Sequence, residues 1–220
     1  TGTASELAEI PCAGLAVMLV RNPNSVNPFE PVRDEMLMRA KVPMTKEEVR
    51  WVSVARLGVQ PGDTVWDIGA GTGAVTFELA RKAMDGAVFA VERNAEAVEL
   101  IAQNRQKLGG FNVHIVPGHA PEVLADLPKP NCVFVGGSGG NMRKIIETAL
   151  MKNPKARIVV NAIALETLQE TQSLFAEFGL QQVEITQLSA ARGKSIGCYT
   201  MMTANNPVFI LSGKGAKYGE

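Results

Sequence analysis

The sequence predicts an α/β fold built on a doubly wound, mostly parallel sheet. From about Thr64 onward, short β-branched runs alternate with longer helical patterns. Gly, Pro, Asn or Asp residues separate most of these segments, as expected for turns. In the last quarter of the chain the helices stop and strand-like runs follow one another directly. Alternation of this kind places helices on both faces of a parallel sheet.

The individual elements follow from these patterns. The expected parallel strands, in chain order, are Thr64–Ile68, Ala87–Val91, Asn112–Val116, Cys132–Val135 and Ala156–Val160. A helix is expected around Ala164 to Phe178, and the strand-like runs after it are Gln182–Thr186, Tyr199–Thr203 and Pro207–Leu211. Because no helix separates these last runs, they predict an antiparallel C-terminal hairpin that closes the sheet. The Met201 and Met202 pair is interpreted as strand core.

Composition narrows the classes of function. A chain of 220 residues with 46% hydrophobic content can form one α/β domain with an appendage. The 22 basic and 22 acidic residues cancel, so no overall field favours nucleic acid or an anionic membrane. Cys12, Cys132 and Cys198 form no C-x-x-C pair, which argues against a disulfide framework and a zinc site. The longest apolar run, Gly14–Val20, is too short to span a membrane, and no leader pattern precedes it. We expect a cytoplasmic protein without a metal or membrane partner.

The first 44 residues differ from the rest. One strand-like run, Leu15–Val20, is followed by a stretch that contains Pro23, Pro28, Pro31 and Pro43. A single strand has no partner of its own in such a segment. We therefore expect residues 1–40 to be a linker with the remnant of a domain upstream, and residues 41–220 to form the main domain.

A glycine-rich loop is the strongest local signal. The segment Asp67-Ile-Gly-Ala-Gly-Thr-Gly-Ala74 lies between an expected strand and an expected helix. Its glycines let bare backbone approach a ligand, and the helix that follows offers unpaired N–H groups at its positive end. Glu92 ends the next strand, where a carboxylate can accept both hydroxyls of a ribose. The loop predicts a nucleotide-like cofactor.

Two cofactors are compatible with this loop. The spacing Gly69-x-Gly71-x-x-Ala74 also satisfies a relaxed dinucleotide pattern, so nicotinamide binding remains an alternative. S-adenosylmethionine is favoured by Asp67, by the extra Gly73 and by a sheet that ends in a hairpin. A glycine turn needed only for close packing of strand and helix is the third possibility.

A helix is expected to begin just after Pro43. Thr45 is the expected N-cap, and Glu48 three residues later would complete a capping box. Capping alone would explain both residues. The functional interpretation is that this turn lies over the methionine end of the cofactor, with Thr45 touching it.

A second glycine cluster follows the fourth expected strand. The segment Val135-Gly-Gly-Ser-Gly-Gly140 leads into a helix at Met142, so the ligand-facing edge carries a second turn suited to anions. The Asp or Asn with prolines and an aromatic residue that grips a flat amine in base- and amine-methylating enzymes is missing here. Bare backbone at these positions suits a large ligand or carboxylates. A flexible connector is the alternative.

Arg192 and Lys194 lie in an expected loop between the last strands. Both could pair with substrate carboxylates, or simply be solvated surface residues. The Gly193-Lys194-Ser195 triplet is not a P-loop, because no glycine stands five residues earlier and no helix follows.

The two histidines differ in position. His114 lies inside a strand pattern and is interpreted as structural. His119 follows the third strand beside Ala120, where the backbone usually meets an adenine edge, so Ala120 is expected to contact the cofactor. His119 could transfer a proton, or be structural as well.

Five motifs in order resemble one family. They are Pro43–Arg50, Asp67–Gly73, Val135–Gly140, Ala191–Gly193 and Asn206–Ile210. Together they resemble the decarboxylating precorrin methyltransferases of cobalamin (vitamin B12) biosynthesis, over about Lys41 to Ile210. The resemblance implies the class I S-adenosylmethionine-dependent methyltransferase fold, with seven strands and an antiparallel C-terminal hairpin.

The resemblance also implies a reaction and a set of site residues. The reaction is methylation of carbon 15 of precorrin-6B, or of its cobalt form, with decarboxylation of the acetate on carbon 12. The cofactor residues implied by pattern and resemblance are Thr45, Asp67, Gly69, Ala70, Gly71, Thr72, Gly73, Glu92 and Ala120. The expected substrate residues are Gly136, Gly137, Ser138, Gly139, Gly140 and Arg192, and the catalytic candidates are Ser138, Arg192, Lys194 and His119. Arg50 and Arg143 are further cations that could meet substrate carboxylates.

Partners follow from the same resemblance. Residues 1–40 resemble the tail of the enzyme that methylates carbon 5, which is fused upstream in some organisms, and the family typically forms a homotetramer. An RNA methyltransferase of the same fold is the alternative, although an aromatic content of 5% counts against stacking on bases. A cofactor-sensing module without turnover is a further alternative.

Overall fold

The computed structural model describes residues 2–11, 14, 17, 19, 21 and 30–216. The strand expected at residues 15–20 therefore lies largely outside the described residues, as do Cys12, Pro23 and Pro28. A short helix, α1 (Ala4–Ala8), is capped by the side chain of Thr3, which accepts a hydrogen bond from the N–H of Glu6.

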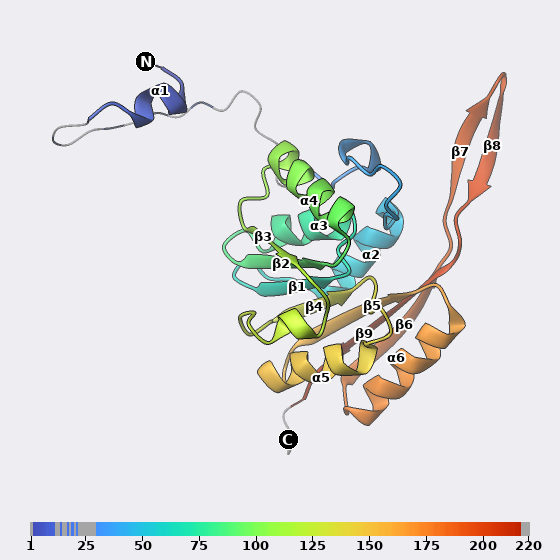
Figure 1. Ribbon diagram of the computed structural model, residues 1–220. Helices are drawn as coiled ribbons and strands as arrows, with labels where there is room; N and C mark the ends of the chain where they lie inside the picture. Colours follow the sequence, from blue (N-terminus) through green and yellow to red (C-terminus); the bar gives the residue numbers. More distant parts are fainter. Residues whose placement is uncertain are drawn as a thin grey trace.

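The described core is a three-layer α/β unit around a seven-stranded sheet with the order β3-β2-β1-β4-β5-β9-β6 (Figure 1). The strands are β1 (Thr64–Ile68), β2 (Ala87–Glu92), β3 (Val113–Pro117), β4 (Cys132–Val135), β5 (Arg157–Ala162), β6 (Gln181–Leu188) and β9 (Val208–Lys214). The first five run parallel, and β9 pairs antiparallel with both β5 and β6. The prediction of a doubly wound, mostly parallel sheet with an antiparallel end is confirmed.

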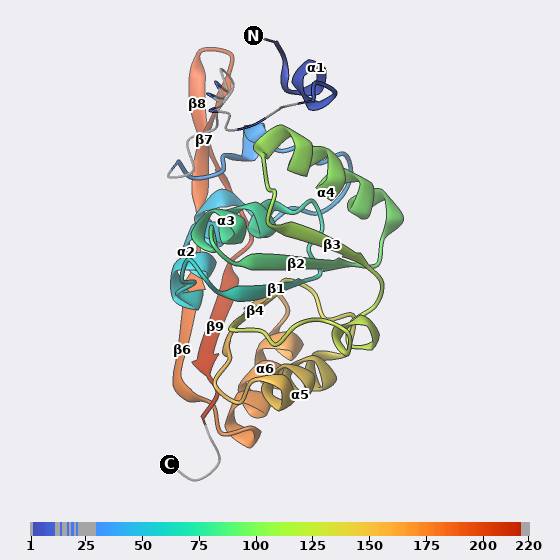
Figure 2. The ribbon, with the colours of Figure 1, turned by 90° about the vertical axis from the view of Figure 1, so that its left-hand side faces the viewer.

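Helices cover both faces of the sheet. The α-helices after α1 are α2 (Glu47–Leu57), α3 (Ala74–Lys82), α4 (Ala95–Leu108), α5 (Met142–Lys152) and α6 (Leu165–Glu177), and the 3-10 turns are η1 (Asp34–Met36) and η2 (Glu122–Leu124). Figure 2 shows α2, α3 and α4 on one side of the strands and α5 and α6 on the other. Alternation along β1 serves both layers: Val65 packs into one core cluster, while Trp66 and Ile68 pack into the other.

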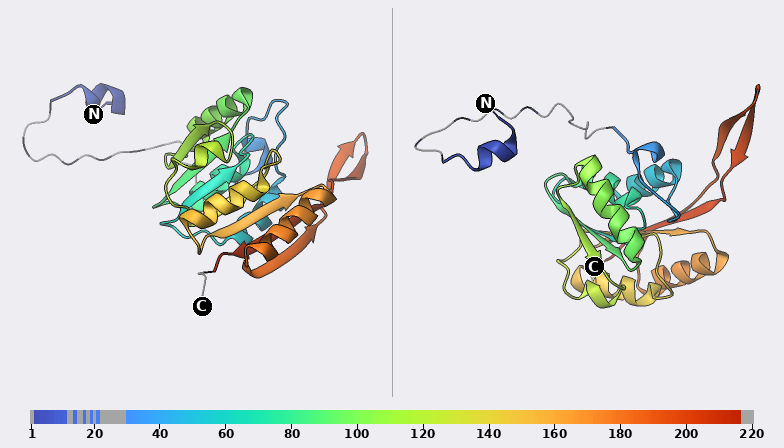
Figure 3. Two further views of the ribbon diagram at one scale, coloured as in Figure 1. Left: turned by 60° about the horizontal axis from the view of Figure 1, so that its bottom comes forward. Right: turned by 45° about the horizontal axis from the view of Figure 1, so that its top comes forward.

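The C-terminal pattern is confirmed in part and corrected in part. The sheet is closed by β6 and β9, whereas Tyr199–Thr203 lies in β8 (Tyr199–Ala204), which is outside that sheet. Its partner is β7 (Ala191–Ile196), the segment expected to be a loop. The two strands form a separate hairpin that projects from the domain (Figure 3). We call β7 and β8 together the arm.

The interpretation of the two methionines as strand core is wrong. Met201 is 56% exposed and Met202 is 67% exposed. A strand residue is buried only where a helix or second sheet covers its face, and the arm extends beyond the helical layers (Figures 1 and 2). Strand propensity alone could not reveal that.

Residues 31–40 pack against the domain. Val32 is fully buried, and its N–H donates to the Glu78 carboxylate on α3 at 2.7 Å. Arg50 of α2 has no exposed surface and donates to Asp34 Oδ1 at 3.1 Å and to the carbonyl of Val32. This segment, placed by the sequence in a linker, is held by a buried arginine. In the described part of the chain, no helix has the length and apolar character needed to cross a membrane.

Candidate active site

A cavity of about 1040 Å³ opens at the carboxyl ends of the parallel strands. Its walls come from both glycine clusters, the end of β2, the turn after β3 and the segment before α2. This edge, where strand order reverses between β1 and β4, is the usual ligand site of doubly wound sheets. Nearly all of the site residues expected from the sequence meet here.

The first glycine loop presents a surface of backbone, with few free donors. The N–H groups of Gly69 and Ala70 donate to the carbonyl of Val91, and that of Gly73 donates to the carbonyl of Ala70. The N–H of Gly71 donates to Glu92 at 2.9 Å. The expectation that bare N–H groups of this loop grip the cofactor is therefore wrong for these four residues. Most of these donors are taken up by the end of β2, to which Val91 and Glu92 belong.

Close approach explains why this loop needs glycine. A Cβ on Gly69 would lie 2.7 Å from the carbonyl oxygen of Gly137, and the residue has a φ of +72°. A Cβ on Gly71 would lie 3.2 Å from the carbonyl oxygen of Pro43. The first loop is thus pressed between the second glycine cluster and the segment before α2. Gly73 instead packs beside Phe77 at the start of α3 and is not part of the cavity wall.

Asp67 is a buried acid in the cavity wall. Its side chain has no exposed surface, and one oxygen accepts a hydrogen bond from the Thr76 hydroxyl. The other oxygen is buried without a partner among the described residues. Burial raises the pKa of Asp67 from 3.8 to about 7, opposed by the Thr76 hydrogen bond and assisted by the nearby Glu92. A cationic ligand would supply the missing partner and favour the ionised form.

Glu92 is held at the end of β2 and faces the cavity. One oxygen accepts from the N–H of Gly71, and the other accepts from the N–H groups of Arg93 and Asn94, all at 2.9 Å. The carboxylate is partly exposed and lines the cavity. Backbone donors thus fix its orientation while lone pairs remain for a ligand.

The turn after β3 contributes His119 and Ala120 to the wall. His119 is exposed, whereas Ala120 is half-buried and its carbonyl accepts from the Asn141 side chain at 3.3 Å. His114 is exposed on β3 and stacks on Phe89 at 4.8 Å between ring centroids. His114 therefore lies outside the cavity, as expected, and His119 is within it.

The second glycine cluster has two halves. The N–H groups of Gly136 and Gly137 donate to the carbonyl of Ile68, which fixes the start of the loop to β1. Gly139 and Gly140 then take positive φ angles, and the carbonyl of Ser138 accepts from the N–H of Asn141. No atom lies within 4 Å of a Cβ built on Gly137 or Gly140. The second half, Ser138 to Gly140, lines the cavity and has open space at Gly140, so we call it the open half.

Three comparisons with known proteins agree. The family described as precorrin methyltransferase domain matches residues 37–214. The chain belongs to this family. A protein of Pyrobaculum calidifontis named "Probable cobalt-precorrin-6B C(15)-methyltransferase (decarboxylating)" is 42% identical over 82% of this chain and 94% of its own length. The Salmonella typhimurium protein named "Cobalt-precorrin-6B C(15)-methyltransferase (decarboxylating)" is 34% identical over 82% and 94%. A crystal structure titled precorrin-6y C5,15-methyltransferase, from Geobacter metallireducens, superposes with a TM-score of 0.79 at 36% identity, covering 84% of this chain and 96% of that one.

Thr45 lines the cavity but is not the helix cap. The N-cap of α2 is Lys46, and no side chain caps the helix. Glu48 does not close a capping box, because its carboxylate accepts two hydrogen bonds from Arg192 at 2.7 Å each. Glu48 therefore bonds to Arg192, 144 residues away in the sequence, and not to the backbone at the start of its own helix.

Arg192 is already paired with acids of its own chain. Besides Glu48, it contacts Asp34 at 3.0 Å and Glu47 at 3.3 Å. The Glu48 hydrogen bonds raise the pKa of Arg192 and lower that of Glu48. Arg192 does not line the main cavity but a second one of about 200 Å³, together with Lys194.

The other two arginines considered from the sequence are also engaged. Arg50 is fully buried in the network that holds residues 31–40. Arg143 forms a two-bond ion pair with Glu177, at 2.6 Å for both bonds, and does not line the cavity. Neither is placed to meet a substrate carboxylate.

Asn161 is a cavity residue that the sequence reasoning missed. It lies near the end of β5, and its side-chain oxygen lies 2.9 Å from the Ser53 hydroxyl, while its side-chain nitrogen is buried without a partner among the described residues. A polar residue at the carboxyl end of a predicted parallel strand was the available signal. Within the described part of the chain, no group of three or more His, Cys, Asp or Glu side chains could hold a metal ion.

Proposed function

We propose that this chain transfers a methyl group from S-adenosylmethionine to carbon 15 of precorrin-6B, or of its cobalt form, and removes the carboxylate of the acetate on carbon 12. The observation that carries the proposal is the family match over residues 37–214, which includes both glycine loops and the whole cavity. Relatives at 34% and 42% identity are named as decarboxylating C(15)-methyltransferases of cobalt-precorrin-6B. This favours the precorrin reaction over methylation of RNA.

The cavity is chemically compatible with S-adenosylmethionine. The unpaired oxygen of Asp67 suits the positive charge of the sulfonium and ammonium groups, and Glu92 suits the two ribose hydroxyls. We infer that Gly69 to Thr72 form the floor of this subsite, that Thr45 lies at the methionine end and that Ala120 meets the adenine edge. The bound cofactor supplies a methyl group activated by its sulfonium. The protein therefore has to align the carbon that receives it and exclude water.

We infer that the open half of the second glycine cluster receives the tetrapyrrole. Gly136 and Gly137 are fixed to β1, while Ser138 and the two glycines after it line the cavity, with free space beside Gly140. Backbone N–H groups in such a turn suit carboxylates. Ser138 and His119 are the catalytic candidates within the main cavity, since Lys194 and Arg192 line the adjacent one.

The decisive experiment measures both halves of the reaction. The chain is incubated with methyl-labelled S-adenosylmethionine and precorrin-6B, and the product is analysed by mass spectrometry. We expect a gain of one labelled methyl group and a loss of one carbon dioxide. Methyl gain alone would remove the decarboxylating half of the proposal. Calorimetry with S-adenosylhomocysteine and with NAD separates this cofactor from nicotinamide, because only the former should bind.

We propose that the protein assembles as a homotetramer and that the arm takes part in its contacts. Ile196, Tyr199, Met201 and Met202 are 52%, 74%, 56% and 67% exposed on this hairpin. A lone two-stranded hairpin is marginal in water, and exposed apolar side chains on it favour association. Analytical ultracentrifugation should give a tetramer for the natural chain and a smaller species for Tyr199→Lys. A monomeric natural chain would contradict this.

We further propose that the part of residues 1–40 that precedes residue 31 is a linker and the tail of an upstream carbon 5 methyltransferase. The C5,15 title of the Geobacter structure supports a fusion of the two activities in relatives. The free thiols of Cys132 and Cys198 are compatible with a reducing cytoplasm. Sequencing the coding region upstream of Thr1 tests the fusion directly.

A further inference from the structure

The second cavity continues the active site toward the arm. Lys46 and Asn205 line both cavities, so a single groove runs from the glycine loops to the space beside Arg192 and Lys194. Lys46 precedes α2, and Asn205 directly follows β8. The smaller cavity therefore lies where the base of the arm meets the start of α2.

One face of the arm supplies the far wall of this groove. Arg192 and Lys194 are two residues apart on β7, so their side chains point to the same side of the hairpin. Thr203 of β8 is the cross-strand neighbour of Arg192 and shares that side. All three residues line the cavity, which agrees with this register.

Arg192 contributes little free charge to the groove. The acids beside it, Asp34, Glu47 and Glu48, are matched by ion pairs with Arg33, Arg50 and Arg192. Through these contacts Arg192 joins the base of the arm to α2 and to residues 31–40. A guanidinium held by three acids is a poor partner for a further carboxylate.

Besides Arg192, the positive charges that line the smaller cavity are Lys46 and Lys194. In the described part of the chain neither Lys46 nor Lys194 forms an ion pair, although every acid at this end of α2 has an arginine partner. Both lysines line the small cavity, together with Asn205 and Thr203. Two ammonium groups and two neutral donors around a small cavity are suited to an anion the size of a carboxylate.

We propose that Lys46 and Lys194, with Asn205, form a subsite for a peripheral carboxylate of the substrate, remote from the carbon that is methylated. This inference rests on the proposed function, because a polycarboxylate macrocycle that shares the main cavity with the cofactor would extend along the groove. The subsite orients the macrocycle and selects substrates that bear a carboxylate at that edge. Lys46 and Lys194 are positioning residues, since they do not touch the reacting atoms.

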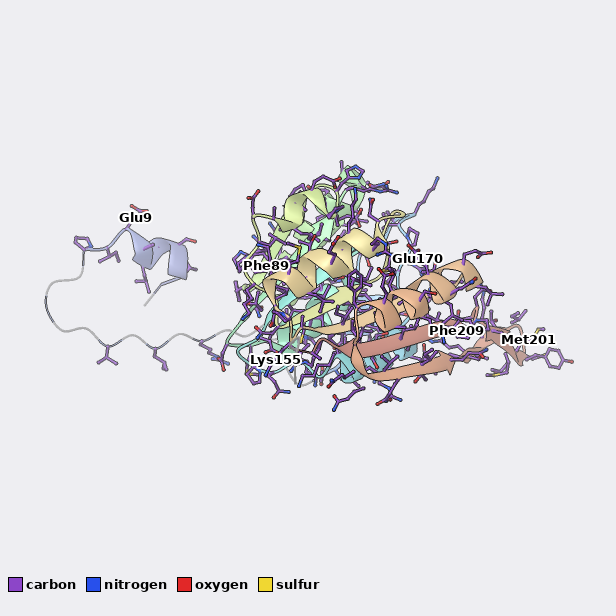
Figure 4. The ribbon with its side chains drawn as sticks, turned by 90° about the horizontal axis from the view of Figure 1, so that it is seen from below. Glu9, Phe89, Lys155, Glu170, Met201 and Phe209 are labelled. Carbon is purple, nitrogen blue, oxygen red and sulfur yellow. The ribbon has the colours of Figure 1, made fainter. Side chains whose placement is uncertain are left out.

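The test compares Lys46→Gln and Lys194→Gln with the natural enzyme on precorrin-6B. Each variant should raise KM about tenfold with kcat changed less than about twofold, because a remote contact binds ground state and transition state alike. Affinity for S-adenosylhomocysteine should be unchanged. Lys194→Arg should restore most of the loss. The matched control is Lys155→Gln, which removes a charge at the opposite side of the domain from the arm (Figure 4) and should leave KM unchanged.

The outcomes separate this inference from the proposed function. Turnover by the natural enzyme with an unchanged KM in both lysine variants would overturn the subsite and leave the function intact. Absence of turnover by the natural enzyme would overturn the function. In that case the subsite is tested by measuring the binding of a porphyrin polycarboxylate and of its methyl ester. The subsite is supported if both lysine variants bind the acid more weakly than the natural chain does, while binding of the ester is unchanged. Equal binding of the acid to natural chain and variants overturns it.

Discussion

The two glycine loops resemble each other in sequence but differ in what the glycines do. In the first loop, the backbone is enclosed: Gly69 meets Gly137, Gly71 meets Pro43, and most N–H groups donate to the end of β2. In the second loop, only the first two glycines are fixed, and Gly140 has a positive φ with open space around it. The first loop is a fixed floor and the second is an open turn.

The difference shows that a glycine-rich motif does not by itself reveal why each glycine is required. At Gly69, any side chain would strike backbone of the neighbouring loop. At Gly140, only the backbone conformation disfavours a side chain, and at Gly137 neither obstacle is present. Alanine substitutions at these positions should therefore have very different effects.

Gly69→Ala should have the largest effect. The new Cβ would lie 2.7 Å from one backbone atom of Gly137 and 2.9 Å from another, so both loops must move apart. Displacement of both walls should lower kcat/KM by at least about 100-fold and weaken binding of S-adenosylhomocysteine, measured by calorimetry. Gly137→Ala is the matched control, with free space at its Cβ and no effect expected on cofactor affinity. If the two variants were equally active, the first loop would not be more closely enclosed than the second.

Much of the fold could be predicted from the sequence because its signals are local. β1 and β4 have the bounds read from β-branched runs, and both glycine clusters stand directly after their strands. The position of Glu92 at the end of the second expected strand predicts a cofactor contact, and Glu92 does line the cavity. A strand with a period of two, or a turn between two strands, can be recognised from neighbouring residues alone, without knowing which distant residues it contacts.

The predictions that failed depend on distant partners. Thr45 and Glu48 have capping-box spacing, but Glu48 pairs with Arg192 of the arm, and the cap passes to Lys46. Arg50 is matched by Asp34 and by the Val32 carbonyl, in a segment that composition assigned to a linker. Contacts of this kind depend on the tertiary fold. A sequence pattern shows which charges are present without showing which are already paired.

Asp67 sharpens the comparison, because it precedes the enclosed loop and has no counterpart before the open one. Its pKa of about 7 exceeds its ordinary value of 3.8, so the folded chain keeps a proton that the unfolded chain has lost between these values. Stability should therefore fall as pH rises from about 4 to about 7, and Asp67→Asn should remove that slope. Thermal denaturation of both proteins over this range checks the sign. A steeper fall in the Asn variant would contradict the assignment.

The same proton couples to cofactor binding. If the cationic cofactor pairs with ionised Asp67, its binding releases the proton. Cofactor affinity should then increase as pH is raised toward about 7, by up to about tenfold for each pH unit. Calorimetry in buffers of different ionisation enthalpy counts the released protons directly. Asp67→Asn should bind more weakly at pH 8 and show a flat profile. An unchanged slope in that variant would place the titrating group elsewhere.

The smallest effect is expected for Gly140→Ala, which tests backbone strain in the open loop in the absence of a close contact. Gly140 has a φ of +84° with no atom near its Cβ, so Gly140→Ala should cost about 1–2 kcal/mol of folding free energy, the usual penalty for a left-handed non-glycine residue. Gly137→Ala lacks both obstacles and should leave the free energy of unfolding unchanged in urea titrations. Because the strain lies at one residue and not between two loops, S-adenosylhomocysteine affinity of the Gly140 variant should stay within about twofold of the natural value. A loss of cofactor affinity as large as in Gly69→Ala would mean that the second loop is as enclosed as the first in solution.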